Sequence, residues 1–422
     1  MSYASLPVVF AAFALAAVAW RLFLAVRQMR HVAVNRDHVP NDFAAVISLE
    51  DHRKAADYTL DKQRAGLVET IAIDGVALLA ITIGGGLAGI ERISRSFLGE
   101  GHLHDLGTVF GLSLVLTLLA LPFDAWRVFV IEERHGFNRM TPGLFLRDLL
   151  KGAALSVALG TPLLLLIFWF VHASGAFWWF YTWLVWILFT LTLVTVFPRW
   201  IAPLFNRFTP LEDEPLRKRI EALIERCGFH ASGLFVMDGS RRSSHGNAYF
   251  TGFGVNKRIV FFDTLIEKLT PAEIEAVLAH ELGHFAKGHI PRLLAVRFAL
   301  AFVLLAILGW LYREPGFYHL LHLEHRHIGV ALAGVGRIVP VFTFPFQPLA
   351  SLMARRQEFE ADAFAAQHAS AADLTSALAK LYRDNAATLT PDPLHSLVYD
   401  SHPPATLRID HLKRGAAAPS PG

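Results

Sequence analysis

The sequence predicts an all-α polytopic membrane protein, with a polar and mostly helical portion that contains a small β-hairpin. Hydrophobic residues make up 54% of the 422 residues and charged residues only 18%, unlike an ordinary soluble domain. Several apolar runs approach the ~20 residues that a helix needs to cross a bilayer. Lysine and arginine concentrate in alternate connecting segments. A single cysteine, Cys227, allows no intrachain disulfide, so a disulfide-stapled fold is excluded.

Seven apolar runs are the predicted transmembrane helices. They cover residues 6–26, 67–90, 108–128, 150–171, 177–197, 293–312 and 328–349. The first run lacks a basic head and a small-residue cleavage site, so we interpret it as an anchor rather than a signal peptide. The last is the weakest, because an arginine and three prolines inside it require protein or water to satisfy the backbone. Asp74 and Arg297 also fall within spans, where charges are expected to face the bundle interior.

The distribution of basic residues predicts the orientation. Residues 27–64, 127–151, 199–292 and those after 355 are rich in lysine and arginine, whereas the intervening loops carry few. We therefore expect the N-terminus outside, and the long polar segment and C-terminus on the cytosolic side. The net charge of +3 then reflects basic segments beside lipid, so nucleic-acid binding is not expected. An alanine-rich chain without a lysine-based retrieval signal favours a bacterial inner membrane, with the endoplasmic reticulum as the eukaryotic alternative.

The chain divides into a five-span region, two polar segments expected to fold together, two further spans between them, and a disordered tail. These parts are residues 1–198, 199–290 with 351–414, 291–350, and 415–422.

Short elements are predicted in the first polar segment. Four apolar residues at helical spacing before Gly228 predict an amphipathic helix over 214–227. Residues 234–237 and 258–262 are interpreted as short β segments, and Gly252, Gly254 and Asn256 as a hairpin turn.

A well-marked helix carries the chemistry. Thr270 and Glu273 form a capping box at its start, and it contains the run His280-Glu281-Leu282-Gly283-His284. One turn apart, the imidazoles of His280 and His284 can both reach one Zn²⁺ at ~2.0–2.1 Å. Glu281, rotated by about 100°, can take a proton from water at the metal's open position, as in H-E-x-x-H metalloproteases. The alternative is a chance pentapeptide on an amphipathic helix, which the marked helix start disfavours.

A catalytic zinc keeps three protein ligands, so a third must come from elsewhere. The metzincin pattern is excluded, because a lysine and an isoleucine stand where it requires glycine and histidine. His289 lies about 180° around the helix from His280 and is interpreted as a structural or supporting histidine. The best source is Glu358, with Asp362 one turn further as an outer partner that can orient a ligand histidine. A solvated acidic helix face is the alternative.

Beyond these residues, the sequence resembles the type I CAAX prenyl protease family, which are integral-membrane zinc metalloendopeptidases. The resemblance covers most of the chain. Its motifs are IEERHGFN at 131–138, FNRFTPL at 205–211, SHGNAYF at 244–250, the run at 280–284, the 358–362 segment, and SHPP at 401–404. One departure is Ala354, where the family usually has serine. The resemblance implies that the seven helices enclose a water-filled chamber, with the zinc site at its cytosolic side.

The resemblance also implies roles for matching positions. One zinc ion per chain would be held by His280, His284 and Glu358, with Glu281 as general base and then acid. Asn247 and His402 would line the site, with His402 placed to stabilise the oxyanion. From the residues alone, 247–249 could form an edge strand that pairs with an extended peptide. Without the resemblance, turn chemistry is the preferred interpretation of Asn247, and an ordinary loop histidine before two prolines is the preferred interpretation of His402.

The family's reference reaction removes the C-terminal tripeptide after a prenylated cysteine, and a second, upstream cut is also known. The expected partners are the lipid bilayer and a peptide or protein substrate, with prenylated proteins as one class. A broad membrane-protein quality-control metalloprotease is the enzymatic alternative, although such relatives have fewer spans. A transporter or channel with a structural zinc site is the non-enzymatic alternative, but it leaves Glu281 without a role and the spans show no repeat.

A histidine-rich segment lies in an outer loop, at His319, His322, His325 and His327. A metal site is one interpretation. A solvated loop is preferred, because spacing alone rarely builds a closed set of ligands.

Overall fold

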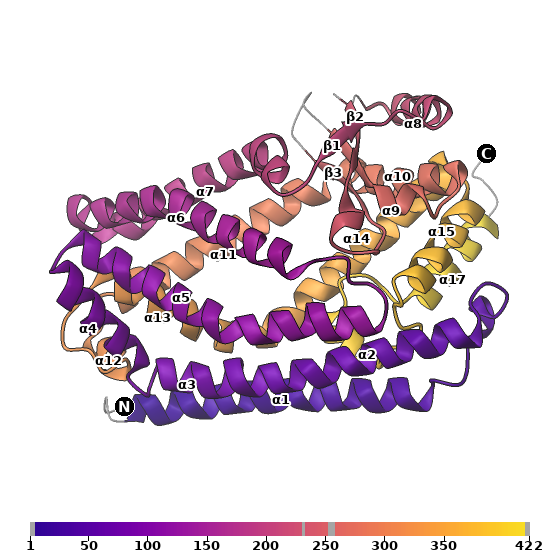
Figure 1. The fold of residues 1–422 in the computed structure, drawn as a ribbon. Coiled ribbons are helices and arrows are strands. Elements are labelled where there is room, and N and C mark those ends of the chain that lie inside the picture. Colours follow the sequence, from indigo (N-terminus) through magenta and orange to yellow (C-terminus); the bar gives the residue numbers. More distant parts are fainter. Residues whose placement is uncertain (1–4, 230–232, 252–257, 418–422) are drawn as a thin grey trace.

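The computed structural model describes residues 5–229, 233–251 and 258–417. The predicted hairpin turn at 252–256 and residues 418–422 of the predicted tail lie outside these ranges. The molecule is elongated, with the long helices running along it (Figure 1). The sheet and the helices α8, α10, α15 and α17 gather at one end, and the chain begins at the other.

Among the described residues, six helical segments are long and apolar enough to cross a membrane, and a bent pair makes a seventh. The six contain α1 (Leu6–Val34), α5 (His102–Trp126), α6 (Pro142–Ala173), α7 (Trp178–Val196), α11 (His289–Leu311), and α13 (Ile328–Thr343) with α14 (Gln347–His368). The bent pair joins α2 (Leu49–Glu69) and α3 (Leu78–Ile81) to α4 (Gly86–Leu98). The prediction of a polytopic α-helical membrane protein with about seven spans is confirmed.

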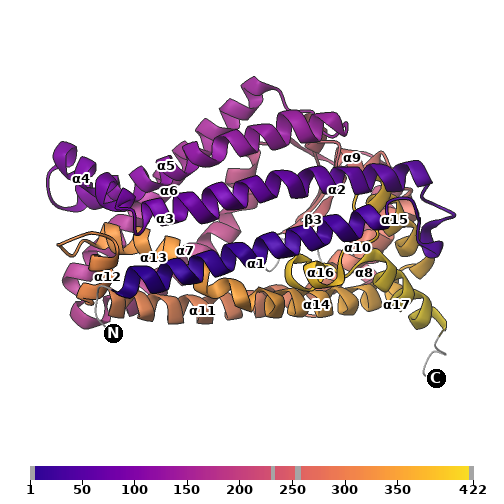
Figure 2. The same cartoon turned by 90° about the horizontal axis from the view of Figure 1, so that it is seen from below.

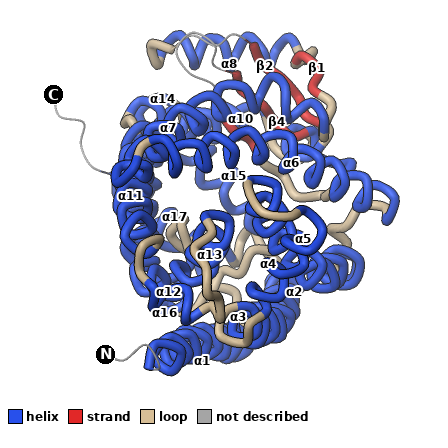
Figure 3. Tube along the Cα trace, turned by 90° about the vertical axis from the view of Figure 1, so that its left-hand side faces the viewer, coloured by secondary structure: helices blue, strands red, loops and turns tan. Residues whose placement is uncertain are grey.

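The helices are arranged in a ring when the molecule is viewed along its length (Figure 3). Seen from below, α1 and α2 run side by side for most of the length (Figure 2). A short helix, α12 (Pro315–Leu320), lies between α11 and α13 in the chain.

The predicted second span, 67–90, is two helices that meet at an angle of 60°. Gly85 has a φ of 77°, a conformation that L side chains rarely adopt. A Cβ on the preceding Gly84 would lie 2.7 Å from the backbone oxygen of Ala80. Glycine at these two positions therefore permits the sharp turn that starts α4.

The last membrane helix does not end at residue 349. After α13 the chain passes through one 3₁₀ turn, Phe344–Phe346, and continues as α14 to His368. Pro345 and Pro348 fall at the starts of these two segments, where a missing backbone N–H costs little. The membrane helix thus leads without a loop to the segment that carries Glu358.

A four-stranded sheet replaces the simple β-hairpin that the sequence predicts. Its order is β1-β2-β4-β3, with β1 and β2 antiparallel, β2 and β4 parallel, and β4 and β3 antiparallel. The strands are β1 (Phe208–Pro210), β2 (Gly233–Met237), β3 (Ala248–Thr251) and β4 (Arg258–Phe262). β3 is at the edge, as predicted for residues near Asn247.

The sheet packs with helices from both polar segments. These are α8 (Glu214–Arg226), α9 (Asp263–Ile266), α10 (Pro271–Ala286), α15 (Ala371–Asp384) and α17 (Ala405–Ala417). The short helix α16 (Pro393–Tyr399) packs instead on α14 and α1. The apolar face predicted for 214–227 is buried in α8. One hydrophobic cluster includes residues from 211–282 and from 365–412, so the two segments share a core. α17 extends to Ala417, three residues into the predicted tail.

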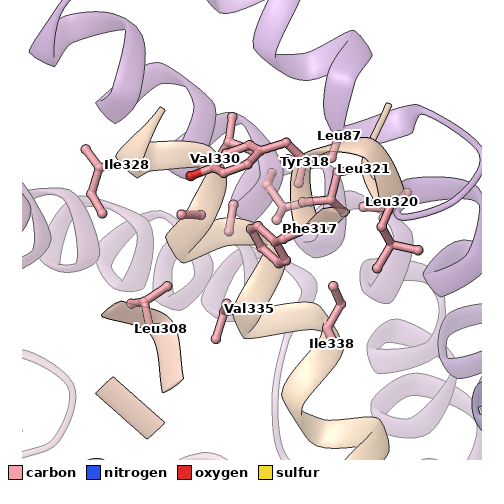
Figure 4. Packing of buried hydrophobic residues seen from close by; sticks show 14 of the residues in the cluster. Leu87, Leu308, Phe317, Tyr318, Leu320, Leu321, Ile328, Val330, Val335 and Ile338 are labelled. Carbon is pink, nitrogen blue, oxygen red and sulfur yellow. The ribbon is translucent and has the colours of Figure 1, made fainter. Parts of the chain in front are cut away.

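A second hydrophobic cluster lies at the opposite end, where α4, α11, α12 and α13 meet (Figure 4). Leu87, Phe317, Leu321 and Val330 are buried there, each 5% exposed or less. This packing anchors the bent helix α4 to the rest of the bundle.

Candidate active site

Helix α10 begins as predicted. The Thr270 backbone N–H donates to Glu273 Oε2 at 2.8 Å, and the Glu273 N–H donates to Thr270 Oγ1 at 3.4 Å. Lys380 Nζ of α15 also donates to Glu273 Oε2 at 2.8 Å. The start of the helix is therefore capped and fixed to its neighbour.

Two histidines of α10 and one glutamate of α14 converge. His280 Nε2 lies 3.3 Å from His284 Nε2 and 3.5 Å from Glu358 Oε2. His284 Nε2 lies 3.4 Å from Glu358 Oε1. These three residues form one of two groups in the described chain whose ligand atoms could hold a metal ion. The structure thus brings together all three residues predicted to be ligands.

The donor set fits a metal ion. Ligands at ~2.0–2.1 Å from a tetrahedral zinc are ~3.3–3.4 Å from one another, close to the 3.3–3.5 Å that separate the two Nε2 atoms from each other and from the Glu358 carboxylate. Glu358 Oε2 is buried and has no well-aligned hydrogen-bond donor among the described residues. Its neighbours are His402 Nδ1 at 2.8 Å and Arg408 Nη1 at 3.5 Å, and the two imidazoles and one carboxylate of the convergent group are ligand types that zinc takes.

Asp362 fixes the orientation of His280. Its Oδ1 lies 2.8 Å from His280 Nδ1, and the carboxylate is fully buried. Arg408 of α17 donates to both Asp362 oxygens, at 2.6 and 2.9 Å. With Nδ1 held by Asp362, Nε2 of His280 faces His284 and Glu358. Burial alone would lower the pKa of His280, but hydrogen bonds to Asp362 and Glu358 raise it to about 9.

His289 supports the second histidine in the same way. Its Nδ1 lies 2.9 Å from His284 Nδ1, and its Nε2 lies 3.0 Å from Glu360 Oε2. Its side chain is buried, at 2% exposure. The interpretation of His289 as a supporting histidine agrees with this geometry, and Glu360 is its anchor.

Glu281 is half-buried on α10, next in the chain to His280. Burial raises the pKa of its carboxyl group, and the neighbouring Glu358 adds to this effect. His280, His284 and His402 oppose the shift. A carboxylate with a raised pKa is suited to accept and return a proton near neutral pH.

The remaining two predicted residues have different surroundings. His402 Nδ1 lies 2.8 Å from Glu358 Oε2, and its side chain is 61% exposed. Asn247 is exposed just before β3, and its Oδ1 accepts a hydrogen bond from the Ala248 N–H at 2.8 Å. The structure therefore places His402 beside the convergent group. It places Asn247 directly before β3, where its backbone C=O accepts a hydrogen bond from the Phe262 N–H at 3.0 Å.

Arg408 was not found by sequence reasoning. Nothing in the local pattern of α17 distinguishes it from the many surface arginines. A buried carboxylate such as Asp362 requires a cationic partner, but the chain offers 39 lysines and arginines. Only the packing of α17 against α14 identifies which one it is.

Comparison with known proteins gives the family. The family model described as "Peptidase family M48" matches residues 210–416, and "CAAX prenyl protease N-terminal, five membrane helices" matches residues 28–207. The chain is 38% identical over 408 residues to the CAAX prenyl protease 1 homolog of Arabidopsis thaliana, covering 92% of each protein. This chain belongs to peptidase family M48.

Further similarities extend over the same length. The chain is 32% identical to the CAAX prenyl protease 1 homolog of Homo sapiens, covering 93% of this chain and 92% of that one. The crystal structure of S. mikatae Ste24p matches with a TM-score of 0.89 and 30% identity, covering 98% of this chain and 99% of that one. The protein is therefore a multi-pass membrane metallopeptidase. The family implies a metal ion, and the convergent group is one of the candidate ligand groups among the described residues.

Proposed function

We propose that this metallopeptidase is a zinc-dependent CAAX prenyl endopeptidase, which removes the C-terminal tripeptide after a prenylated cysteine. The observation that carries the proposal is the convergence of His280, His284 and Glu358, with Glu281 beside them, where the last membrane helix enters the polar end of the molecule. The names and full-length similarity of the relatives support the substrate class.

In this proposal the three convergent residues hold one zinc ion per chain. When bound, zinc supplies the Lewis acidity that polarises the scissile carbonyl and acidifies water. Glu281 takes the proton from the attacking water and returns it to the leaving amide nitrogen. Asp362 and His289 keep the two imidazoles oriented with Nε2 toward the centre.

His402 is proposed to stabilise the oxyanion. Its Nδ1 lies at Glu358, so Nε2 is the nitrogen that can reach toward substrate. Because its side chain is largely exposed, it can approach a bound peptide without rearranging the core.

The edge strand β3 is proposed to hold the substrate. An edge strand offers backbone N–H and C=O groups to an extended peptide. β3 pairs with β4 on one side only. Asn247 stands at its start, where its amide can contact the same peptide. The peptide would enter from a chamber within the ring of helices.

We further propose that the N-terminus faces outward and that the site and C-terminus are cytosolic. The segments rich in lysine and arginine support this orientation through the positive-inside rule. The bacterial inner membrane is the proposed location.

The test is cleavage of paired peptides. Detergent-purified protein is incubated with a peptide ending in a farnesylated C-a-a-X motif and with its unprenylated twin, and the released tripeptide is quantified. Release from the farnesylated peptide alone, lost in Glu281→Gln, is the expected result. Equal cleavage of both peptides would instead favour the quality-control alternative. Cleavage that persists in Glu281→Gln would remove the proposed role of Glu281.

A further inference from the structure

Three metal-binding side chains meet at the end of the molecule remote from the peptidase centre. Glu91 comes from α4, His104 from the first turn of α5, and His327 is the residue before α13. One ligand atom of each lies within 4.8 Å of the others. The helix α11 starts beside His284 and has 23 residues, so it extends about 35 Å from the first group toward this end of the molecule.

The cluster is buried and incompletely satisfied. His104 is 0% exposed and Glu91 is 4% exposed. Neither ring nitrogen of His104 makes a well-aligned hydrogen bond within the described part of the chain. His104 Nε2 instead lies 3.1 Å from Glu91 Oε1, close to the ~3.3–3.4 Å between two ligands of one tetrahedral metal ion. A buried histidine whose ring nitrogens make no well-aligned hydrogen bond is costly, and a metal ion bound between His104 and Glu91 would remove this cost.

The backbone around the cluster is held firmly. Asp105 Oδ1 accepts a hydrogen bond from the Gly329 N–H at 2.8 Å. A Cβ on Gly329 would lie 2.5 Å from the Asp105 backbone oxygen, so the starts of α5 and α13 are in direct contact. The hydrophobic cluster of Figure 4 includes Leu87 of α4 and Val330 of α13. The three metal-binding residues therefore stand on elements that cannot easily move apart.

Arg95 shows that this position attracts positive charge. Its guanidinium is hydrogen-bonded to Glu91, and its Nη2 lies 3.2 Å from His327 Nε2. The lone pair of His327 and the Glu91 carboxylate thus both face a cation. The Arg95 side chain is 34% exposed, so it can turn into solvent when a smaller and more highly charged cation takes its place.

We propose that Glu91, His104 and His327 form a second metal site, which binds Zn²⁺. Because its ligands come from α4, α5 and the start of α13, the bound ion would link these three helices. Two imidazoles and one carboxylate suit zinc, and a water can complete the coordination. The site secures the bent helix α4 and takes no part in peptide hydrolysis. It does not depend on the proposed substrate, because its ligands are separate from those of the peptidase centre.

The test counts metal in the full-length detergent-purified protein. Each variant is equilibrated with a Zn²⁺ buffer and analysed by inductively coupled plasma mass spectrometry, and its peptidase activity is measured on the same sample. Wild type is expected to bind two equivalents. Glu91→Gln and His327→Gln are expected to bind one and to keep the activity. His325→Gln, a change at an exposed histidine in the same segment, is the matched control and is expected to bind two.

Two further measurements make the result decisive. Zn²⁺ added to His284→Ala protein should raise the thermal midpoint of unfolding, and Glu91→Gln in the same background should abolish this shift. Arg95→Gln removes the competing guanidinium and should lower the Kd for the second Zn²⁺ about tenfold. One equivalent in wild type at saturating Zn²⁺, or a second equivalent that survives both Glu91→Gln and His327→Gln, would overturn the proposal while leaving the peptidase assay unaffected.

Discussion

Gly283 of α10 packs against Ala361 of α14 so closely that a Cβ on Gly283 would lie 2.9 Å from the Ala361 Cα. The two helices carry His280 and Glu358, so this contact sets the separation of the convergent side chains. Gly283→Ala is expected to push the helices apart, destabilise the fold by about 1–3 kcal/mol and lower kcat/KM by about 100-fold. Thermal unfolding and peptide hydrolysis measure the two effects.

The control for this change is Gly152→Ala. Gly152 lies inside α6, and a Cβ there would meet nothing within 4 Å. Because alanine is the better helix former, this variant should be as stable as wild type or slightly more so. Wild-type activity in Gly283→Ala would show that the close contact does not position the site.

Substitutions at Glu281 and His284 should have different effects on metal content and on turnover. Glu281→Gln keeps the shape of the side chain and leaves the convergent group intact, so we expect full metal content with kcat lowered by about 10²–10⁴-fold. His284→Ala removes one of three donors and should lose the metal as well as the activity. Metal analysis and turnover are measured on the same samples. Loss of metal from Glu281→Gln would argue that it is a ligand rather than a base.

Arg408 and Lys413 provide a matched pair on α17. Arg408→Met leaves the Asp362 carboxylate buried without its cation, which should cost about 3 kcal/mol and weaken metal binding about 10–100-fold through His280. Lys413→Met breaks an exposed ion pair with Asp42, which solvent screens, and should leave stability close to that of wild type. Chemical denaturation and metal titration distinguish them, and similar effects from both would show that Arg408 is an ordinary surface charge.

The sequence predicted those features that depend on local periodicity. Apolar length identified the spans, and the spacing of His280 and His284 placed two imidazoles on one face. Glu358 followed from the need for a third donor, although no local pattern required it. The length of a span and the spacing of two histidines are properties of a single helix, so both can be predicted before the fold is known.

Features that depend on how distant elements meet could not be predicted. β1 has three residues, ends in proline, and exists because it pairs with β2. Arg408 matters only because α17 packs against α14. His327 was interpreted as part of a solvated loop, since nothing in the chain links it to Glu91 and His104. In each case the pairing residues lie far apart in sequence, so tertiary packing alone decides the outcome.

Glu273 makes the stability of the site helix depend on pH. Burial would raise the pKa of this carboxyl group, but hydrogen bonds from Lys380, Ser376 and Thr270 hold it below its ordinary value of 4.5. A lowered pKa means that the folded state binds this proton less tightly than the unfolded state. The stabilisation is therefore present above about pH 4.5 and is lost as the pH falls through the lower, folded-state value.

Glu273→Gln should accordingly be less stable than wild type at neutral pH, and the difference should shrink in acid. The measurement is the thermal midpoint of both proteins in detergent between neutral pH and about pH 3, across the range in which a carboxyl group titrates. Glu221→Gln on α8 is the control, because Glu221 is exposed and its nearest basic partner is 4.0 Å away. A stability difference for Glu273→Gln that stays constant with pH would mean that packing of the side chain, rather than its charge, stabilises the start of α10.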